Sequence, residues 1–212
     1  MAEITKLNGG GSNCYLVTEN NSSILIDTGM KRKRESILKA CSNKNVKLIV
    51  LTHGHIDHVE NAAYLSKMLK VPVAIHEKDI PLLKDNLCRK MSAEGLLGNM
   101  VCFFSKVGAK YTALEPFDID VLLKEGDNLL ENYGVNVDII EFPGHTEGSI
   151  GVHVGAEDLI VGDALMNMVR PSVSLLYEDR DRMLASVNKI EKYKDNLIHF
   201  GHWNSVVNKK WI

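Results

Sequence analysis

The chain has 212 residues, of which 45% are hydrophobic and 25% charged, so it can bury a core and is not a disordered chain. Its 25 lysines and arginines nearly balance its 27 aspartates and glutamates, which argues against non-specific nucleic-acid binding. No apolar run approaches the roughly 18 residues of a membrane span. We therefore expect a soluble protein of one domain, residues 1–212, with neither nucleic acid nor membrane as a partner.

Strands and helices alternate along the first half of the chain, which predicts an α/β protein. In chain order we expect strands at 4–7, 14–18 and 23–27, a helix at 35–40, a strand at 46–51, a helix at 60–69, a strand at 71–75 and a helix at 79–87. The strand at 46–51 is a nearly continuous apolar run, which is typical of a strand buried on both faces.

Segment 88–114 interrupts this alternation. Its apolar residues recur at helical spacing, so it predicts an inserted helix or pair of helices. We expect a structural cover, with a substrate lid or a homodimer surface as the alternatives. Beyond it, the pattern predicts strands at 119–123, 135–142, 150–154 and 159–161, a helix at 181–192 and a strand at 197–200.

Four side chains of metal-binding types lie within six residues after the strand at 46–51: His53, His55, Asp57 and His58. Imidazoles and carboxylates are ligands of zinc, iron and manganese. His53 and His55 are two residues apart in an extended loop, so they point the same way and can share one ion. Asp57 and His58, at the turn into the next helix, are offset and can serve a second ion.

Several other predicted strands end directly on a carboxylate or an imidazole. These residues are Asp27, His145, Asp163 and His202. Loops beyond strand ends are where α/β proteins build their sites. We therefore expect these side chains to converge with the histidine segment.

The ligand count predicts two divalent ions with a water between them. The first ion would take His53, His55 and His145, the second Asp57, His58 and His202, and Asp163 would bridge the two. Zinc is the favoured metal, with iron or manganese as alternatives, because nitrogen and oxygen ligands serve all three. Water held between two cations is nucleophilic at neutral pH, because the metals lower its pKa.

These motifs resemble those of the metallo-β-lactamase superfamily. The resemblance rests on His53-Gly54-His55-Ile56-Asp57-His58, Pro143-Gly144-His145-Thr146, Gly162-Asp163 and Gly201-His202, in order over nearly the whole chain. It implies a four-layer αββα sandwich of two mixed β-sheets, with a dinuclear site at one edge. It also implies the same ligand set, with Asp27 beneath the site ordering the histidine loop.

The resemblance also narrows the choice among the branches of this superfamily. Asp163 stands where β-lactamases of this fold usually place a cysteine, which implies the thioesterase, lactonase, nuclease or flavo-di-iron branches. The chain ends shortly after His202, and we find no segment for the extra domains of full-length glyoxalase II, of the nucleases or of the flavoproteins. We therefore expect a stand-alone, glyoxalase II-like metallohydrolase with a small-molecule substrate.

The favoured reaction is attack of a bridging hydroxide on an ester-type bond, in a thioester or a lactone. Asp57 would steer the nucleophile and later pass a proton to the leaving group. Two alternatives stay open. One is an iron-dependent oxidoreductase of the di-iron reductase or persulfide dioxygenase type, and the other is a non-catalytic metal-bound binding module.

The remaining chemistry-bearing residues receive plainer interpretations. We expect His76, His153 and His199 to be structural, and the basic run 31–34 to be solvated, with an anionic subsite as the alternative. For Arg170 and Tyr177 we favour loop packing over substrate contact. Scattered cysteines and the lack of a signal peptide predict reduced thiols in the cytoplasm.

Overall fold

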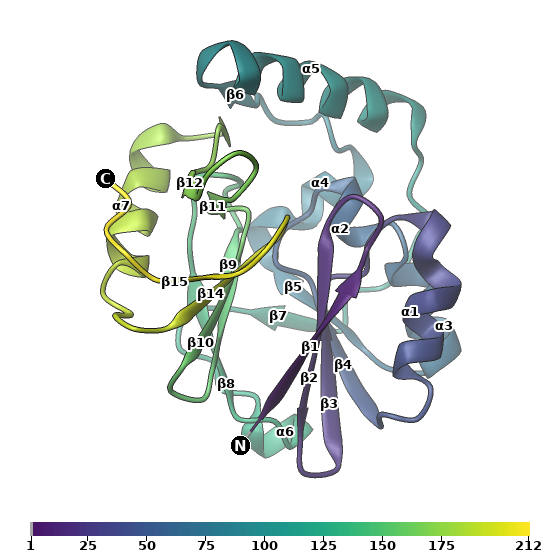
Figure 1. Cartoon of the computed structure of the whole chain (residues 1–212). Helices are drawn as coiled ribbons and strands as arrows, with labels where there is room; N and C mark the ends of the chain where they lie inside the picture. Colours follow the sequence, from purple (N-terminus) through teal and green to yellow (C-terminus); the bar gives the residue numbers. More distant parts are fainter. Residues whose placement is uncertain (1) are drawn as a thin grey trace.

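Two β-sheets packed face to face form the centre of the structure, and helices cover their outer faces (Figure 1). The computed structural model describes residues 2–212. The sandwich of two mixed sheets with flanking helices confirms the predicted αββα architecture.

The first sheet has the strand order β1-β2-β3-β4-β5-β7. Its strands are β1 (Glu3–Asn8), β2 (Asn13–Glu19), β3 (Ser22–Ile26), β4 (Val46–Val50), β5 (Val73–His76) and β7 (Val121–Leu123). The first three strands pair antiparallel, whereas β3, β4, β5 and β7 run parallel. The carboxyl ends of the parallel strands therefore meet at one edge of the sandwich.

The second sheet has the strand order β15-β14-β10-β9-β8. Its strands are β8 (Val137–Glu141), β9 (Ile150–Val154), β10 (Asp158–Gly162), β14 (Leu197–Phe200) and β15 (Val206–Val207). β10 and β14 pair in parallel, and the other pairs are antiparallel. Two short antiparallel pairs lie outside both sheets: β11 (Leu165–Met166) with β12 (Ser172–Val173), and β6 (Ser92–Ala93) with β13 (Leu176–Tyr177).

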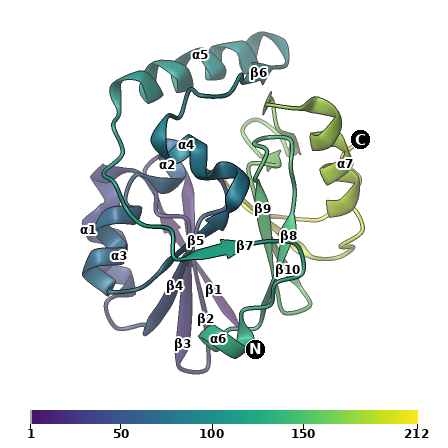
Figure 2. The same cartoon turned by 180° about the vertical axis from the view of Figure 1, so that it is seen from behind.

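The helices form the outer layers. α1 (Arg34–Cys41) and α3 (Ala62–Leu69) flank the first sheet, and α7 (Arg180–Ile190) flanks the second (Figure 2). α5 (Gly95–Tyr111) lies apart from both layers, across the end of the sandwich in Figure 1. The short helices are η1 (Lys31–Lys33), α2 (Ile56–Val59), η2 (Glu77–Asp79), α4 (Ile80–Lys84) and α6 (Leu130–Tyr133).

Alternating side chains of the central strands fill two different cores. In β4, Leu48 and Val50 face the second sheet, whereas Ile49 faces the layer of α1 and α3. A third core lies between the second sheet and α7, around Phe142 and Phe200. Burial on both faces explains the continuous apolar runs of the sequence.

The structure corrects several predicted boundaries. The helix expected at 60–69 is α3, which begins at Ala62 and is preceded by the separate short helix α2. Between the two helices, the buried Asn61 side chain donates to the carbonyls of Thr28, Gly29 and Met30. The helix expected at 79–87 ends at Lys84. Of the two alternatives for segment 88–114, a helix or a pair of helices, the structure has the single helix α5. Among residues 2–212, none of the helices has the length and apolar character needed to cross a membrane.

Candidate metal centre

Seven side chains predicted as ligands converge at the edge where the strands end. Their sources are the loop after β4 and helix α2 for His53, His55, Asp57 and His58, the loop after β8 for His145, the end of β10 for Asp163, and the loop after β14 for His202. Their donor atoms form three overlapping groups, in each of which the atoms lie within 4.8 Å of one another. The groups are His53–His55–His145, His53–His58–Asp163 and Asp57–His58–His202.

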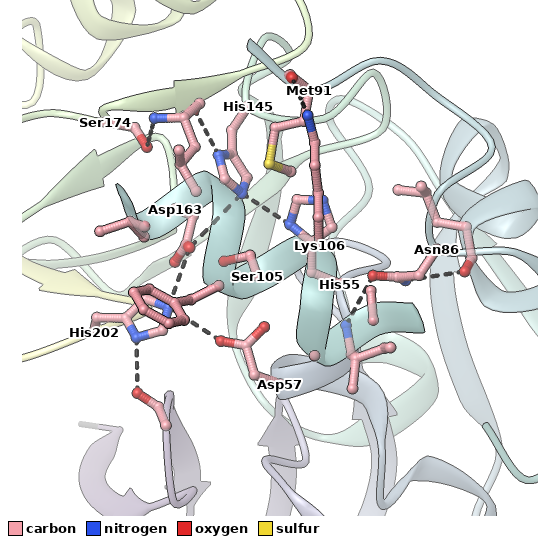
Figure 3. Close-up of a pocket in the computed structure, with 18 of the residues that line it drawn as sticks. His55, Asp57, Asn86, Met91, Ser105, Lys106, His145, Asp163, Ser174 and His202 are labelled. Atoms are coloured by element: carbon pink, nitrogen blue, oxygen red, sulfur yellow. Dashed lines mark hydrogen bonds and ion pairs between the residues drawn. The ribbon is translucent and has the colours of Figure 1, made fainter. Parts of the chain in front are cut away.

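Individual distances show how tightly the donor atoms face one another (Figure 3). His55 Nδ1 lies 3.0 Å from His145 Nε2. His202 Nε2 lies 3.2 Å from Asp163 Oδ2 and 3.3 Å from Asp57 Oδ2. Asp163 thus sits between the two sides of the cluster, since its oxygens also lie within 3.7 Å of His58 Nε2 and His145 Nε2.

The buried donor atoms fit a bound cation. His53 Nε2, His58 Nε2 and Asp163 Oδ1 are buried and have no hydrogen-bond partner within the protein. Buried polar atoms are normally satisfied, so unpaired ones call for an explanation such as an ion. Imidazole nitrogens and carboxylate oxygens in these numbers are the donor set of zinc, iron or manganese.

Asp27 holds the histidine loop from below, as the family resemblance implied. Its buried carboxylate accepts hydrogen bonds from the Thr52 amide (2.8 Å) and hydroxyl (2.9 Å), and lies 2.8 Å from His58 Nδ1. The Thr52 hydroxyl in turn lies 3.0 Å from His53 Nδ1. These contacts point the Nε2 atoms of His53 and His58 toward the cluster.

Backbone carbonyls orient the two distant histidines in the same way. His145 Nδ1 donates to the carbonyl of Leu176 at 2.9 Å, and His202 Nδ1 donates to that of Gly11 at 2.8 Å. Each hydrogen bond fixes the tautomer in which Nε2 carries no proton and can bind a cation.

Asp79, in η2, is a site residue that the sequence interpretation missed. Its carboxylate is fully buried and accepts from the amides of Gly54 and Gly148, both at 2.8 Å, and from the Thr146 hydroxyl at 2.7 Å. It therefore joins the loop of His53 and His55 to the loop of His145. A signal was present, because Asp79 follows the β5 strand as the other site carboxylates follow theirs.

At Gly201 the cluster leaves no room for a side chain. A Cβ added there would lie 2.0 Å from Asp163 Oδ1 and 2.9 Å from His58 Cε1. The glycine before His202 thus lets the chain pass directly beside the ligands.

The histidines fall into two groups by pKa. Burial and the neighbouring imidazoles lower the pKa of His53 well below its usual range and that of His55 to about 3. Burial also acts to lower the pKa of His58, but the adjacent carboxylates outweigh it and raise the pKa to about 10. The pKa of His202 is raised to about 9, because Asp163 outweighs the effect of burial. The imidazoles of His53 and His55 thus stay neutral on one side of the centre, whereas those of His58 and His202 on the other side lie against carboxylates.

A cavity of about 380 Å³ opens above the cluster. Its floor includes His55, Asp57 and Asp163, and residues of α5 form one of its walls (Figure 3). The predicted insertion therefore covers the site, and this position is the one expected of either a structural cover or a lid.

The other sequence interpretations can be compared with the structure. His76, His153 and His199 are hydrogen-bonded to Glu141, Asn196 and Asp158 respectively, as expected of structural histidines. The basic run 31–34 does not line the cavity, and neither do Arg170 and Tyr177. All four cysteines are free thiols.

The comparisons with known proteins agree with this site. The model of the metallo-beta-lactamase superfamily matches residues 7–202, and the chain belongs to this superfamily. A protein of Methanocaldococcus jannaschii named as a probable metallo-hydrolase is 30% identical over 194 residues, covering 89% of this chain and 85% of the relative. Hydroxyacylglutathione hydrolase 1 of Vibrio vulnificus is 28% identical, over 93% of this chain and 64% of the relative.

Solved structures share the fold. The crystal structure of TTHA1623 in a di-iron-bound form superimposes with a TM-score of 0.71 at 25% identity, covering 97% of this chain and 94% of the other. The BLEG-1 B3 metallo-beta-lactamase gives a TM-score of 0.74 at 20% identity, over 98% of this chain and 94% of the other.

Proposed function

We propose that the chain is a metal-dependent hydrolase that cleaves an ester-type bond in a small molecule, with a thioester or a lactone as the favoured substrate. The observation that carries the proposal is the set of buried, unpaired donor atoms on His53, His58 and Asp163 beneath an open cavity. The similarity to a hydroxyacylglutathione hydrolase supports thioester cleavage.

The candidate ligands divide into two groups, one for each cation. One cation would be held by His53, His55 and His145, a second by Asp57, His58 and His202, and Asp163 would contact both. Bound divalent cations supply Lewis acidity and a water of lowered pKa.

Asp57 is the catalytic residue of this proposal. Its side chain is 34% exposed, lines the cavity and has Oδ2 3.3 Å from His202 Nε2. A carboxylate in this position orients an attacking water by accepting its hydrogen bond, and it then delivers the proton to the leaving group. Asp27 and Asp79 act as positioning residues, because they hold the ligand loops and do not line the cavity.

A redox function is the second candidate, because the similar TTHA1623 was crystallised with two irons. Nitrogen and oxygen ligands suit iron as well as zinc. Metal analysis of protein purified without added metal, together with its visible spectrum, separates the two. Native iron with a visible band that changes on reduction would favour the oxidoreductase.

The test of the hydrolase is an assay panel on protein stripped of metal and reloaded with zinc, iron or manganese. The panel contains thioesters, lactones and phosphodiesters, and metal content is measured on every sample. We expect turnover of a thioester or a lactone that His145→Ala abolishes and that Asp118→Asn, at an exposed carboxylate outside the cavity lining, leaves unchanged. Full metal loading without turnover of any substrate would overturn the proposal and favour a binding module.

A further inference from the structure

We propose that the cavity above the metal centre selects substrates with an apolar acyl chain of medium length. This inference rests on the proposed function, because it names the substrate class of the same site.

The walls of the cavity are mainly apolar. Helix α5 contributes Val101, Phe104 and Ala109 to one wall. Three methionines, Met30, Met91 and Met166, line other parts of it. Methionine is unbranched and flexible, so such walls adjust to chains of different shape. A volume of about 380 Å³ is that of a small ligand pocket.

The one guanidinium in the described lining is already neutralised. Arg89 lies 3.1 Å from Asp79 Oδ1 and 2.8 Å from Glu178 Oε2. Two carboxylates thus hold the Arg89 guanidinium, which presents no free charge to the acyl chain. The lining ammonium, on Lys106, donates to the carbonyl of Met91 at 3.1 Å. Among the described residues no carboxylate pairs with Lys106, so its ammonium stays charged, and the acyl chain is expected to lie along the apolar walls away from it.

Phe104 gives the second independent indication. Its side chain lines the cavity and is still 64% exposed to solvent. A large aromatic ring left in water beside a site gains free energy when an apolar ligand covers it. An acyl chain lying along α5 from the metal centre would provide that cover.

Burial of each methylene sets the expected size of the effect. Transfer of one methylene from water into an apolar wall favours binding about fourfold. If the chain is buried in the transition state, kcat/KM rises about fourfold per methylene until the cavity is full, and then levels off or falls.

The first experiment measures kcat/KM of metal-loaded protein for neutral thioesters from acetyl to dodecanoyl. We expect a steep rise with acyl length. A flat profile or an optimum at acetyl would each overturn the inference.

A matched pair of variants on α5 tests the wall directly. Val101 lines the cavity, whereas Val107 is exposed on the same helix and lies outside the lining. We expect Val101→Trp to lower kcat/KM for the longer acyl chains, relative to that for acetyl, at least tenfold. Val107→Trp is expected to keep the parental profile. Equal profiles for both variants would overturn the assignment of this wall.

Binding by metal-free protein separates the two proposals. Neutral straight-chain alcohols from butanol to decanol are titrated calorimetrically, and none of them can be hydrolysed. We expect affinity to rise with length in the parent and in Val107→Trp, and to be lost for the longer alcohols in Val101→Trp. Length-dependent binding without any turnover would contradict the proposed hydrolase but support the proposed acyl-chain cavity. Turnover without length dependence would support the hydrolase and contradict the acyl-chain cavity.

Discussion

Asp79 offers the sharpest test of how the two ligand loops are held together. Each of its carboxylate oxygens accepts two hydrogen bonds, Oδ1 from Gly148 N and Arg89 Nη2, and Oδ2 from Gly54 N and Thr146 Oγ1. Asp79→Asn replaces one oxygen by an amide nitrogen of nearly the same size. In either orientation the new donor faces two donors, so two hydrogen bonds to a charged acceptor are lost.

The magnitude follows from those two bonds. A hydrogen bond to a charged group contributes about 1.5–3 kcal/mol, so Asp79→Asn is expected to lower the free energy of unfolding by about 3–6 kcal/mol. Because the loops carry His53, His55 and His145, we also expect metal affinity to fall about 10- to 100-fold. Asp79 lies outside the cavity lining and is not one of the candidate ligands. A fall in metal affinity in Asp79→Asn therefore reports loss of ligand positioning and not removal of a ligand.

Urea unfolding of metal-free protein and competition with a chromophoric chelator measure the two effects. Asp118→Asn, at an exposed carboxylate, is the control and should change the free energy of unfolding by less than about 0.5 kcal/mol. If the free energy of unfolding of Asp79→Asn also differs from that of the parent by less than about 0.5 kcal/mol, the carboxylate does not hold the loops together, and the reasoning is wrong.

Three further predictions concern the metal centre and the thiols. Zinc at 100 times its dissociation constant should stabilise the parent by about 2.7 kcal/mol, and a chelator should reverse this; a melting temperature indifferent to zinc would speak against a folded cation site. Gly201→Ala should abolish loading of the site next to Asp163, whereas Gly108→Ala, where an added Cβ meets nothing within 4 Å, should load normally in the same metal analysis. In native protein at pH 8, iodoacetamide should modify the exposed Cys88 first, because burial raises the pKa of the Cys41 thiol to about 11; equal labelling by mass spectrometry would refute this.

The position of the candidate site was predictable because its residues mark the ends of strands. Buried parallel strands read as continuous apolar runs, and a polar residue directly after such a run lies at the sheet edge. His53, Asp163 and His202 were predicted in this way, because they follow the ends of β4, β10 and β14. The prediction did not need the order of the strands, because the two sheets bring these strand ends to the same edge.

Features that depend on packing between distant segments could not be predicted in the same way. Asp79 lies in the short helix η2 that follows β5, but its role depends on donors from a loop 67 residues away, such as the Thr146 hydroxyl. The pairing of β6 with β13 joins two-residue strands that have no periodicity to detect. The helical spacing of α5 predicted a helix, but nothing in the spacing says which face would cover the cavity.

The cluster is built so that its framework, rather than the cation, sets its geometry. An unpaired buried polar atom costs about 1–3 kcal/mol, so the free donors on His53, His58 and Asp163 together cost about 3–9 kcal/mol. That is a large share of the 5–15 kcal/mol by which a domain is stable, so strong contacts elsewhere must hold the donors in place. The far nitrogens of four of the histidines make such contacts, with the partners Thr52, Asp27, the Leu176 carbonyl and the Gly11 carbonyl. Because the donors are ordered before binding, a cation recovers this cost directly and has no loop to order, which favours high affinity at an exposed edge of the fold.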